Sequence, residues 1–114
     1  MKKRVDANQP ELVAVMRRLG CSWRSTHEIP GALDGIIGVA GIDQRIEIKD
    51  GKKPPSARRL TDAEQDEFDT WRGRPPRVVE SVEQLIVLIA DLKREGYGNK
   101  TNDDRTGRVS AGTR

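Results

Sequence analysis

The sequence predicts one small α/β domain, with the element order α-β-β-β-α-β-α around a small mixed β-sheet flanked by helices. Three segments carry helix signals, at residues 9–19, 62–71 and 82–93. Between them lie short segments rich in β-branched residues. A chain of 114 residues with 34% hydrophobic residues has room for one domain with a modest core. We expect the first two helices to cover the faces of the sheet.

The domain is expected to span residues 9–94. Residues 1–8 form a basic lead-in with Lys2, Lys3 and Arg4, and a solvated terminus explains it more simply than phosphate contact. Residues 95–114 are dominated by Gly, Asn, Ser and Thr with scattered charges, so we expect a flexible tail.

The helix at 9–19 is expected to begin after Asn8, which can cap it, and to end at Gly20. Its buried stripe consists of Leu12, Val15, Met16 and Leu19. Glu11 lies in the first turn, where its carboxylate can form a capping box with Asn8 and interact favourably with the helix dipole.

The first strand is predicted at residues 22–29. His27 is the only histidine, and a hydrogen-bonded structural role is the simpler reading of it. Cys21, at the start of the strand, is expected to be a small packed apolar residue. Because the chain has one cysteine and no Cys/His cluster, we expect neither an intramolecular disulfide nor a structural zinc.

A β-hairpin is predicted at residues 30–49, and it contains the main candidate catalytic residues. In its second strand Arg45, Glu47 and Lys49 share one face, because side chains alternate with period two. If the loop is Ala40-Gly41 or Gly41-Ile42, Asp34 comes to the same face, within roughly 5–8 Å of Glu47 or Lys49 at Cβ. A three-residue loop without a bulge would put Asp34 on the opposite face.

Two carboxylates beside a lysine suit phosphodiester hydrolysis. Mg²⁺ takes one or two carboxylates and keeps waters and phosphate oxygens as its other ligands. A neighbouring lysine can orient a water or balance the charge of a phosphate. Asp34, Glu47 and Lys49 are therefore candidate catalytic residues for a metal-dependent nuclease.

The remaining elements follow from local signals. Residues 50–59 are basic and hold Pro54-Pro55, so we expect neither a helix nor a central strand there. This segment is either a solvated connector or, through Lys52, Lys53, Arg58 and Arg59, a DNA-binding loop. Thr61 and Glu64 form a capping box that opens the second helix, with Phe68 and Trp71 as its main anchors.

A short strand is predicted at residues 77–80, and Ser81 with Gln84 caps the last helix. Its apolar stripe consists of Val82, Leu85, Ile86, Ile89 and Leu92. Val87 and Leu88 widen the stripe, which indicates either deeper burial or a subunit contact.

Asp34, followed after twelve residues by Glu47-Ile48-Lys49, resembles the catalytic signature of the PD-(D/E)xK nuclease superfamily. In order and spacing the chain is similar to small phage-type VRR-NUC endonucleases, relatives of the archaeal Holliday-junction resolvases. The similarity covers roughly residues 4–92 and includes Val5–Glu11, Leu19-Gly20, Leu60–Gln65, Trp71–Gly73 and Val78–Ser81. The chain departs from the family at Leu33, where a proline is usual.

The resemblance implies a restriction-endonuclease-like core in residues 9–94 and Mg²⁺-dependent cleavage of DNA, with branched or Holliday-junction DNA as one candidate substrate. Asp34, Glu47 and the carbonyl of Ile48 would bind Mg²⁺, for which Mn²⁺ would substitute. Glu11 would be a further acidic group of the metal site, acting through a water or a second metal, and it could fill this role and the capping role together. Gln65 would touch DNA, with a plain exposed residue as the alternative. A homodimer is also implied, because symmetric cutting of two strands needs two sites related by a two-fold axis.

Composition agrees with these expectations without requiring them. The net charge of +3 is compatible with nucleic acid but too small to demonstrate it. No apolar run reaches 18 residues and the N-terminus lacks a signal-peptide core, so we expect a cytoplasmic protein, phage-encoded and acting in a bacterial host by resemblance, with no membrane partner. The rival hypothesis is a non-catalytic nucleic-acid-binding or assembly module with the same fold. The intact Asp34/Glu47/Lys49 set argues against it.

Overall fold

The computed structural model describes residues 6–98. Its elements follow the predicted order: α1 (Gln9–Arg18), β1 (Ser22–Ser25), β2 (Gly35–Val39), β3 (Ile42–Ile48), the 3₁₀ helix η1 (Pro55–Arg58), α2 (Asp62–Thr70), β4 (Arg77–Val79) and α3 (Val82–Gly98). The four strands lie in the order β1-β2-β3-β4. The first three are antiparallel and β4 runs parallel to β3, so the predicted α/β class and mixed sheet are confirmed.

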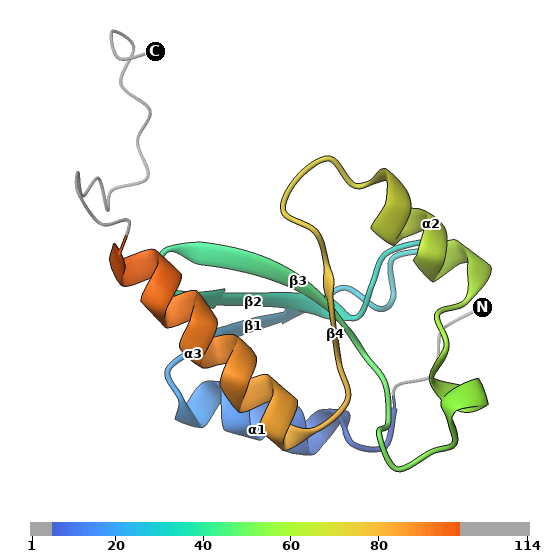
Figure 1. Cartoon of the computed structure of the whole chain (residues 1–114), viewed down its shortest axis with the longest axis horizontal. Helices are drawn as coiled ribbons and strands as arrows, with labels where there is room; N and C mark the ends of the chain where they lie inside the picture. Colours follow the sequence, from blue (N-terminus) through green and yellow to red (C-terminus); the bar gives the residue numbers. More distant parts are fainter. Residues whose placement is uncertain (1–5, 99–114) are drawn as a thin grey trace, which may run out of the picture.

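The helices are distributed differently from the expectation. Figure 1 shows α3 lying across the sheet with α1 beside it, whereas α2 stands apart from them beyond β4 in this view. Apolar side chains of α1 and α3 form the core with one face of the sheet. That core includes Leu12, Met16, Ile37, Ile46, Ile48, Val79, Leu85, Leu88 and Ile89. Full burial of each large aliphatic side chain contributes about 1.5–3 kcal/mol, so this layer stabilises the domain.

The opposite face of β3 carries the polar side chains. Strand alternation puts Arg45, Glu47 and Lys49 on the side away from Ile46 and Ile48. α2 approaches this face through ion pairs to two of them. The prediction that α1 and α2 cover the sheet is therefore wrong for α2: α3 packs on the sheet with α1, and α2 flanks the charged face.

Several predicted boundaries are corrected. The first strand ends at Ser25 rather than at residue 29, because the chain turns after Thr26: the N–H of Ile29 donates back to the carbonyl of Thr26 at 3.0 Å, and the Thr26 hydroxyl donates to the carbonyl of Leu33. A one-turn 3₁₀ helix forms within residues 50–59, where no helix was expected, and Pro55 is tolerated in its first turn.

The last helix continues to Gly98, so the expected tail boundary at residue 95 falls inside α3. Gly96 allows this continuation, because a Cβ there would lie 2.2 Å from the carbonyl oxygen of Ala40 in the β2–β3 turn. Glu95 adds a bidentate ion pair with Arg74. The rest of the predicted tail and most of the basic lead-in lie outside the described residues.

Exposure corrects two expected core positions. Ile86 is exposed, whereas Leu88 is buried in the core, as one of its two predicted alternatives had it. Trp71 follows the last residue of α2 and is 48% exposed, so it is not a core anchor of that helix. Within residues 6–98 we find no helix that is long and apolar enough to cross a membrane.

Candidate functional site

The turn of the β2–β3 hairpin determines which face Asp34 occupies. Val39 pairs with Ile42, so the loop is Ala40-Gly41, one of the even-numbered alternatives. Both loop residues have positive φ, as a type I′ turn requires. Gly35 pairs with Ile46, and one further step along the ladder sets Asp34 opposite Glu47. The structure thus brings together the two carboxylates that the sequence selects.

Asp34 is held firmly in this position. Its side chain is buried, with 3% of the residue exposed. One carboxylate oxygen, Oδ2, accepts the backbone N–H of Ile48 at 2.7 Å. On its other side, the carbonyl of Asp34 accepts the N–H of Thr26 at 2.8 Å. Asp34 therefore joins the loop after β1 to the end of β3.

Glu47 and Lys49 lie side by side on the charged face. Glu47 is 1% exposed, and its Oε2 lies 3.5 Å from Nζ of Lys49. Glu64 of α2 accepts a shorter bond from the same ammonium, at 2.8 Å. Burial lowers the pKa of Lys49, but the hydrogen bond and charge of Glu64, together with Glu47, outweigh it and leave the pKa raised. Lys49 is therefore a fixed cation at neutral pH.

Glu64 is a site residue that the sequence analysis missed. It was expected to cap α2, and this capping box is confirmed: its carboxylate accepts the N–H of Thr61 at 2.9 Å, while its own N–H donates to the Thr61 hydroxyl. The same oxygen also accepts from Lys49, so one buried carboxylate starts the helix and positions the lysine. Capping boxes are common, and nothing local in the sequence marks this one as part of a site.

The turn before α1 reaches the site in a way that corrects the predicted cap. The Asn8 side chain makes no capping hydrogen bond; its amide instead donates to the carbonyl of Lys49 at 3.1 Å. Burial raises the pKa of the Asp6 carboxyl, and the charge of Asp34 raises it further. Asp6 is thus an acidic neighbour of the site that the sequence analysis did not select.

Glu11 occupies a different environment. It is exposed and makes no capping box with Asn8, since that side chain is turned toward Lys49. It lines a hollow together with Asp50, Arg58 and residues at the start of α3. Its role as a further acidic group of the site stays a prediction.

The donor set fits a hard divalent cation. Asp34 and Glu47 offer carboxylate oxygens from opposed positions, and one oxygen of Asp34 accepts the N–H of Ile48. The described residues contain no cluster of three or more His, Cys, Asp and Glu that could hold a metal. A pair of carboxylates is nevertheless sufficient for Mg²⁺, which fills its remaining positions with water and substrate phosphate oxygens.

The basic loop contains exposed cations and one anchored cation. Lys52, Lys53 and Arg59 are exposed. Arg58 is half-buried, donates to the carbonyl of Lys53 at 2.8 Å and pairs with Glu80 at 3.2 Å. It therefore anchors the loop, which leaves the other three as the better candidates for phosphate contact.

The remaining residues that the sequence analysis considered, Gln65, His27 and Cys21, make local contacts. Gln65 is exposed and bonds Asp69 of its own helix at 2.9 Å. His27 Nδ1 lies 2.7 Å from the Ser25 hydroxyl, consistent with a structural role. Cys21 is buried, and burial raises the pKa of its thiol, so it packs as an apolar residue.

Comparison of the chain with protein-family models, with curated proteins and with solved structures finds no match.

Proposed function

We propose that the protein is a Mg²⁺-dependent DNA endonuclease with a restriction-endonuclease-like core. The observation that carries the proposal is the opposition of Asp34 and Glu47 in the hairpin, with Lys49 next along the same face. Burying a carboxylate costs free energy unless it is paired and hydrogen-bonded, and here Asp34 accepts the Ile48 N–H while Glu47 lies beside Lys49. Here they are presented beside a cation that is itself held by Glu64, which is an arrangement suited to phosphodiester chemistry.

Each side chain has a definable task. Asp34 and Glu47 would hold Mg²⁺, which supplies Lewis-acid activation of the phosphate and of a water, and the Ile48 carbonyl would add a ligand. Lys49, protonated at neutral pH, would donate to a phosphate oxygen and stabilise the charge that builds up there. Glu64 and Asn8 would position Lys49 through its ammonium and its carbonyl.

Branched or Holliday-junction DNA is the substrate class that the family resemblance supports. A homodimer would supply the two sites that symmetric cutting needs. Leu88 is buried within the domain, so of the two extra apolar residues on α3 only Val87, which is 60% exposed, is placed to contact a second copy. The same resemblance supports a phage-encoded protein acting in the cytoplasm of a bacterial host.

The decisive experiment is cleavage of a panel of duplex, flap, junction and single-stranded DNA with Mg²⁺, Mn²⁺ and no metal. Asp34→Asn and Glu47→Gln should abolish cleavage because they remove metal-binding charge with little change of shape. Asp43→Asn is the matched control, since Asp43 lies on the same strand and face but is exposed. Metal-dependent cleavage retained by both site variants would refute the assignment. DNA binding without cleavage by the wild type would favour the non-catalytic module.

A further inference from the structure

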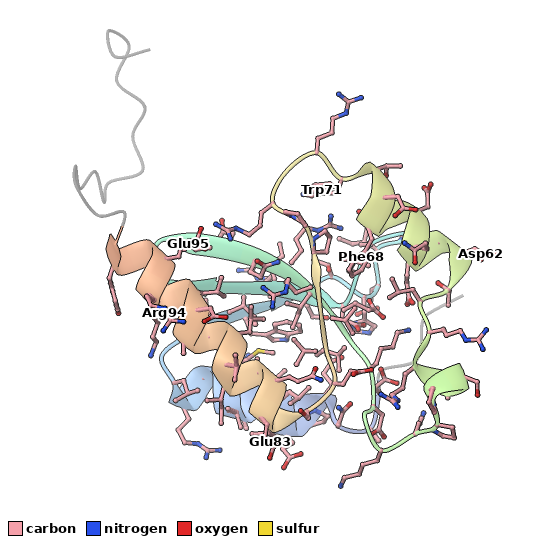
Figure 2. All side chains as sticks on the ribbon, in the orientation of Figure 1. Asp62, Phe68, Trp71, Glu83, Arg94 and Glu95 are labelled. Carbon is pink, nitrogen blue, oxygen red and sulfur yellow. The ribbon has the colours of Figure 1, made fainter. Side chains whose placement is uncertain are left out.

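An aromatic side chain lies exposed on the charged face of the sheet. Trp71 directly follows α2 and leaves 48% of its surface in contact with solvent. Figure 2 shows it where the chain leaves α2 and bends toward β4, with Phe68 one turn earlier in the helix. A large exposed aromatic held in one orientation is a candidate contact for a flat ligand.

Trp71 is held by Arg45. The guanidinium carbon of Arg45 lies 3.9 Å from the centre of the indole ring, a close cation–π stack. Glu67 fixes the other side of the guanidinium through an ion pair at 2.5 Å. Arg45 therefore covers one ring face, and Gly73 lies against the five-membered ring, where a Cβ would come within 2.8 Å of Nε1, while 48% of the residue stays exposed.

The stack is anchored close to the proposed metal site. Arg45 precedes Glu47 by two residues on the same face of β3, which places their backbones roughly 7 Å apart. Proteins that bind single strands commonly combine positive groups that follow the backbone with aromatic side chains on which bases stack. A strand whose phosphate lies at Glu47 and Lys49 can thus place a nearby base at Trp71.

The charges around Trp71 are of both signs. Asp66 and Asp69 lie exposed on α2, and Arg72 lies exposed directly after Trp71. The exposed cations Lys52, Lys53 and Arg59 lie on the loop that leaves Lys49. That loop offers three cations to the DNA backbone, so a strand bound along it can turn a base toward the indole.

We propose that Trp71, stacked on Arg45, is a platform for an unpaired nucleobase of the DNA substrate. This inference rests on the proposed nuclease function and adds a substrate class to it: DNA with single-stranded or unstacked nucleotides beside the cut. Stacking on an aromatic ring is tolerant of sequence, because every base has a π face. Fully paired duplex has no base available for the platform.

The chain offers an internal control, because its other tryptophan lies on the opposite face. Trp23 pairs with Ile37 of the core face, and its ring covers Gly35, where a Cβ would lie 2.3 Å from the indole. The variants Trp23→Phe and Trp71→Phe each keep one tryptophan. Their fluorescence is titrated with a fluorescently labelled oligothymidine and with blunt duplex, using Ca²⁺ in place of Mg²⁺, while anisotropy of the label reports binding.

Oligothymidine should quench the Trp23→Phe protein, which keeps Trp71, and leave the Trp71→Phe protein unquenched. Trp71→Ala should weaken binding of oligothymidine by roughly 5- to 150-fold, with a smaller effect on duplex. Binding seen by anisotropy without quenching of Trp71 would overturn the platform but leave the nuclease proposal standing. No binding of any DNA would overturn both.

Discussion

Replacement of Asp34 by Asn and by Ala separates its role in the site from its role in the fold. Both variants remove the carboxylate that we assign to the metal, so neither should cleave DNA. They differ in what they leave for Ile48, whose buried N–H donates to Oδ2 of Asp34 at 2.7 Å. The amide oxygen of Asn can still accept this bond, whereas Ala leaves the donor without a partner.

The cost of the orphaned donor sets the expected magnitude. An unsatisfied buried N–H costs about 1–3 kcal/mol, so Asp34→Ala should be less stable than Asp34→Asn by about that amount. For a domain of this size each 1 kcal/mol lowers the melting temperature by roughly 4–8 °C. Asp34→Asn should match or exceed the wild type in stability without metal, because it removes one of two neighbouring negative charges.

Thermal unfolding followed by far-ultraviolet circular dichroism, without divalent metal, measures the difference, and plasmid nicking with Mg²⁺ measures the activity. Asp43→Asn, on the same strand, controls for loss of an exposed acid and should retain activity and stability. Equal melting temperatures for Asp34→Asn and Asp34→Ala would refute the structural role of the Ile48 bond. Full nicking by Asp34→Asn would refute the metal site.

Three further predictions test the charges around this centre. Glu64→Gln keeps a capping residue but removes a charge that raises the pKa of Lys49. The loss of cleavage at alkaline pH should therefore begin at a lower pH than in the wild type. Superimposable pH–rate profiles of the two proteins would contradict this. Because the folded pKa of Lys49 is raised, its stabilisation is present at neutral pH and is lost only as the pH rises through that pKa. Asp6→Asn should stabilise the fold at pH 7 by less than about 1 kcal/mol, since the raised pKa means that ionisation opposes folding, and urea midpoints should show no gain well below pH 3.8. A triple variant replaces the exposed loop cations Lys52, Lys53 and Arg59 with alanine. It should reduce the slope of log K against log salt concentration for duplex DNA by up to about 2.7, whereas Arg58→Ala should mainly lower the melting temperature. An unchanged slope in the triple variant would assign phosphate contact to other residues.

The element order and, for an even-numbered loop, the face that Asp34 occupies could be predicted because their signals are local. Apolar spacing and caps mark the helices, as the Thr61 capping box shows. A two-residue loop with Gly at its second position favours a type I′ hairpin, and once that loop forms, Asp34 has to face Glu47. Local chemistry and register were therefore sufficient to select the pair of carboxylates.

The partners of Lys49 could not be predicted in the same way. Asn8 reaches the Lys49 carbonyl across 41 residues, and Glu64 reaches its ammonium across 15. Both residues also carry a strong local signal for capping, which is a sufficient explanation until the helices are packed. The structural role of Asp34 could not be predicted for the same reason, because its bond to the Ile48 N–H exists only in the folded hairpin.

These long-range contacts also connect the stability of the fold to the chemistry of the site. Asp34 bonds Ile48, Glu64 and Asn8 bond Lys49, and the N–H of Lys49 donates to the carbonyl of Val79 in β4. The end of β3 is thus held by the hairpin, by α2, by the turn before α1 and by the edge strand. Any substitution that removes one of these contacts should leave the site residues less firmly positioned and should lower the free energy of unfolding. Isosteric changes such as Asp34→Asn, Glu47→Gln and Glu64→Gln remove charge while keeping oxygen acceptors, so they separate loss of chemistry from loss of structure.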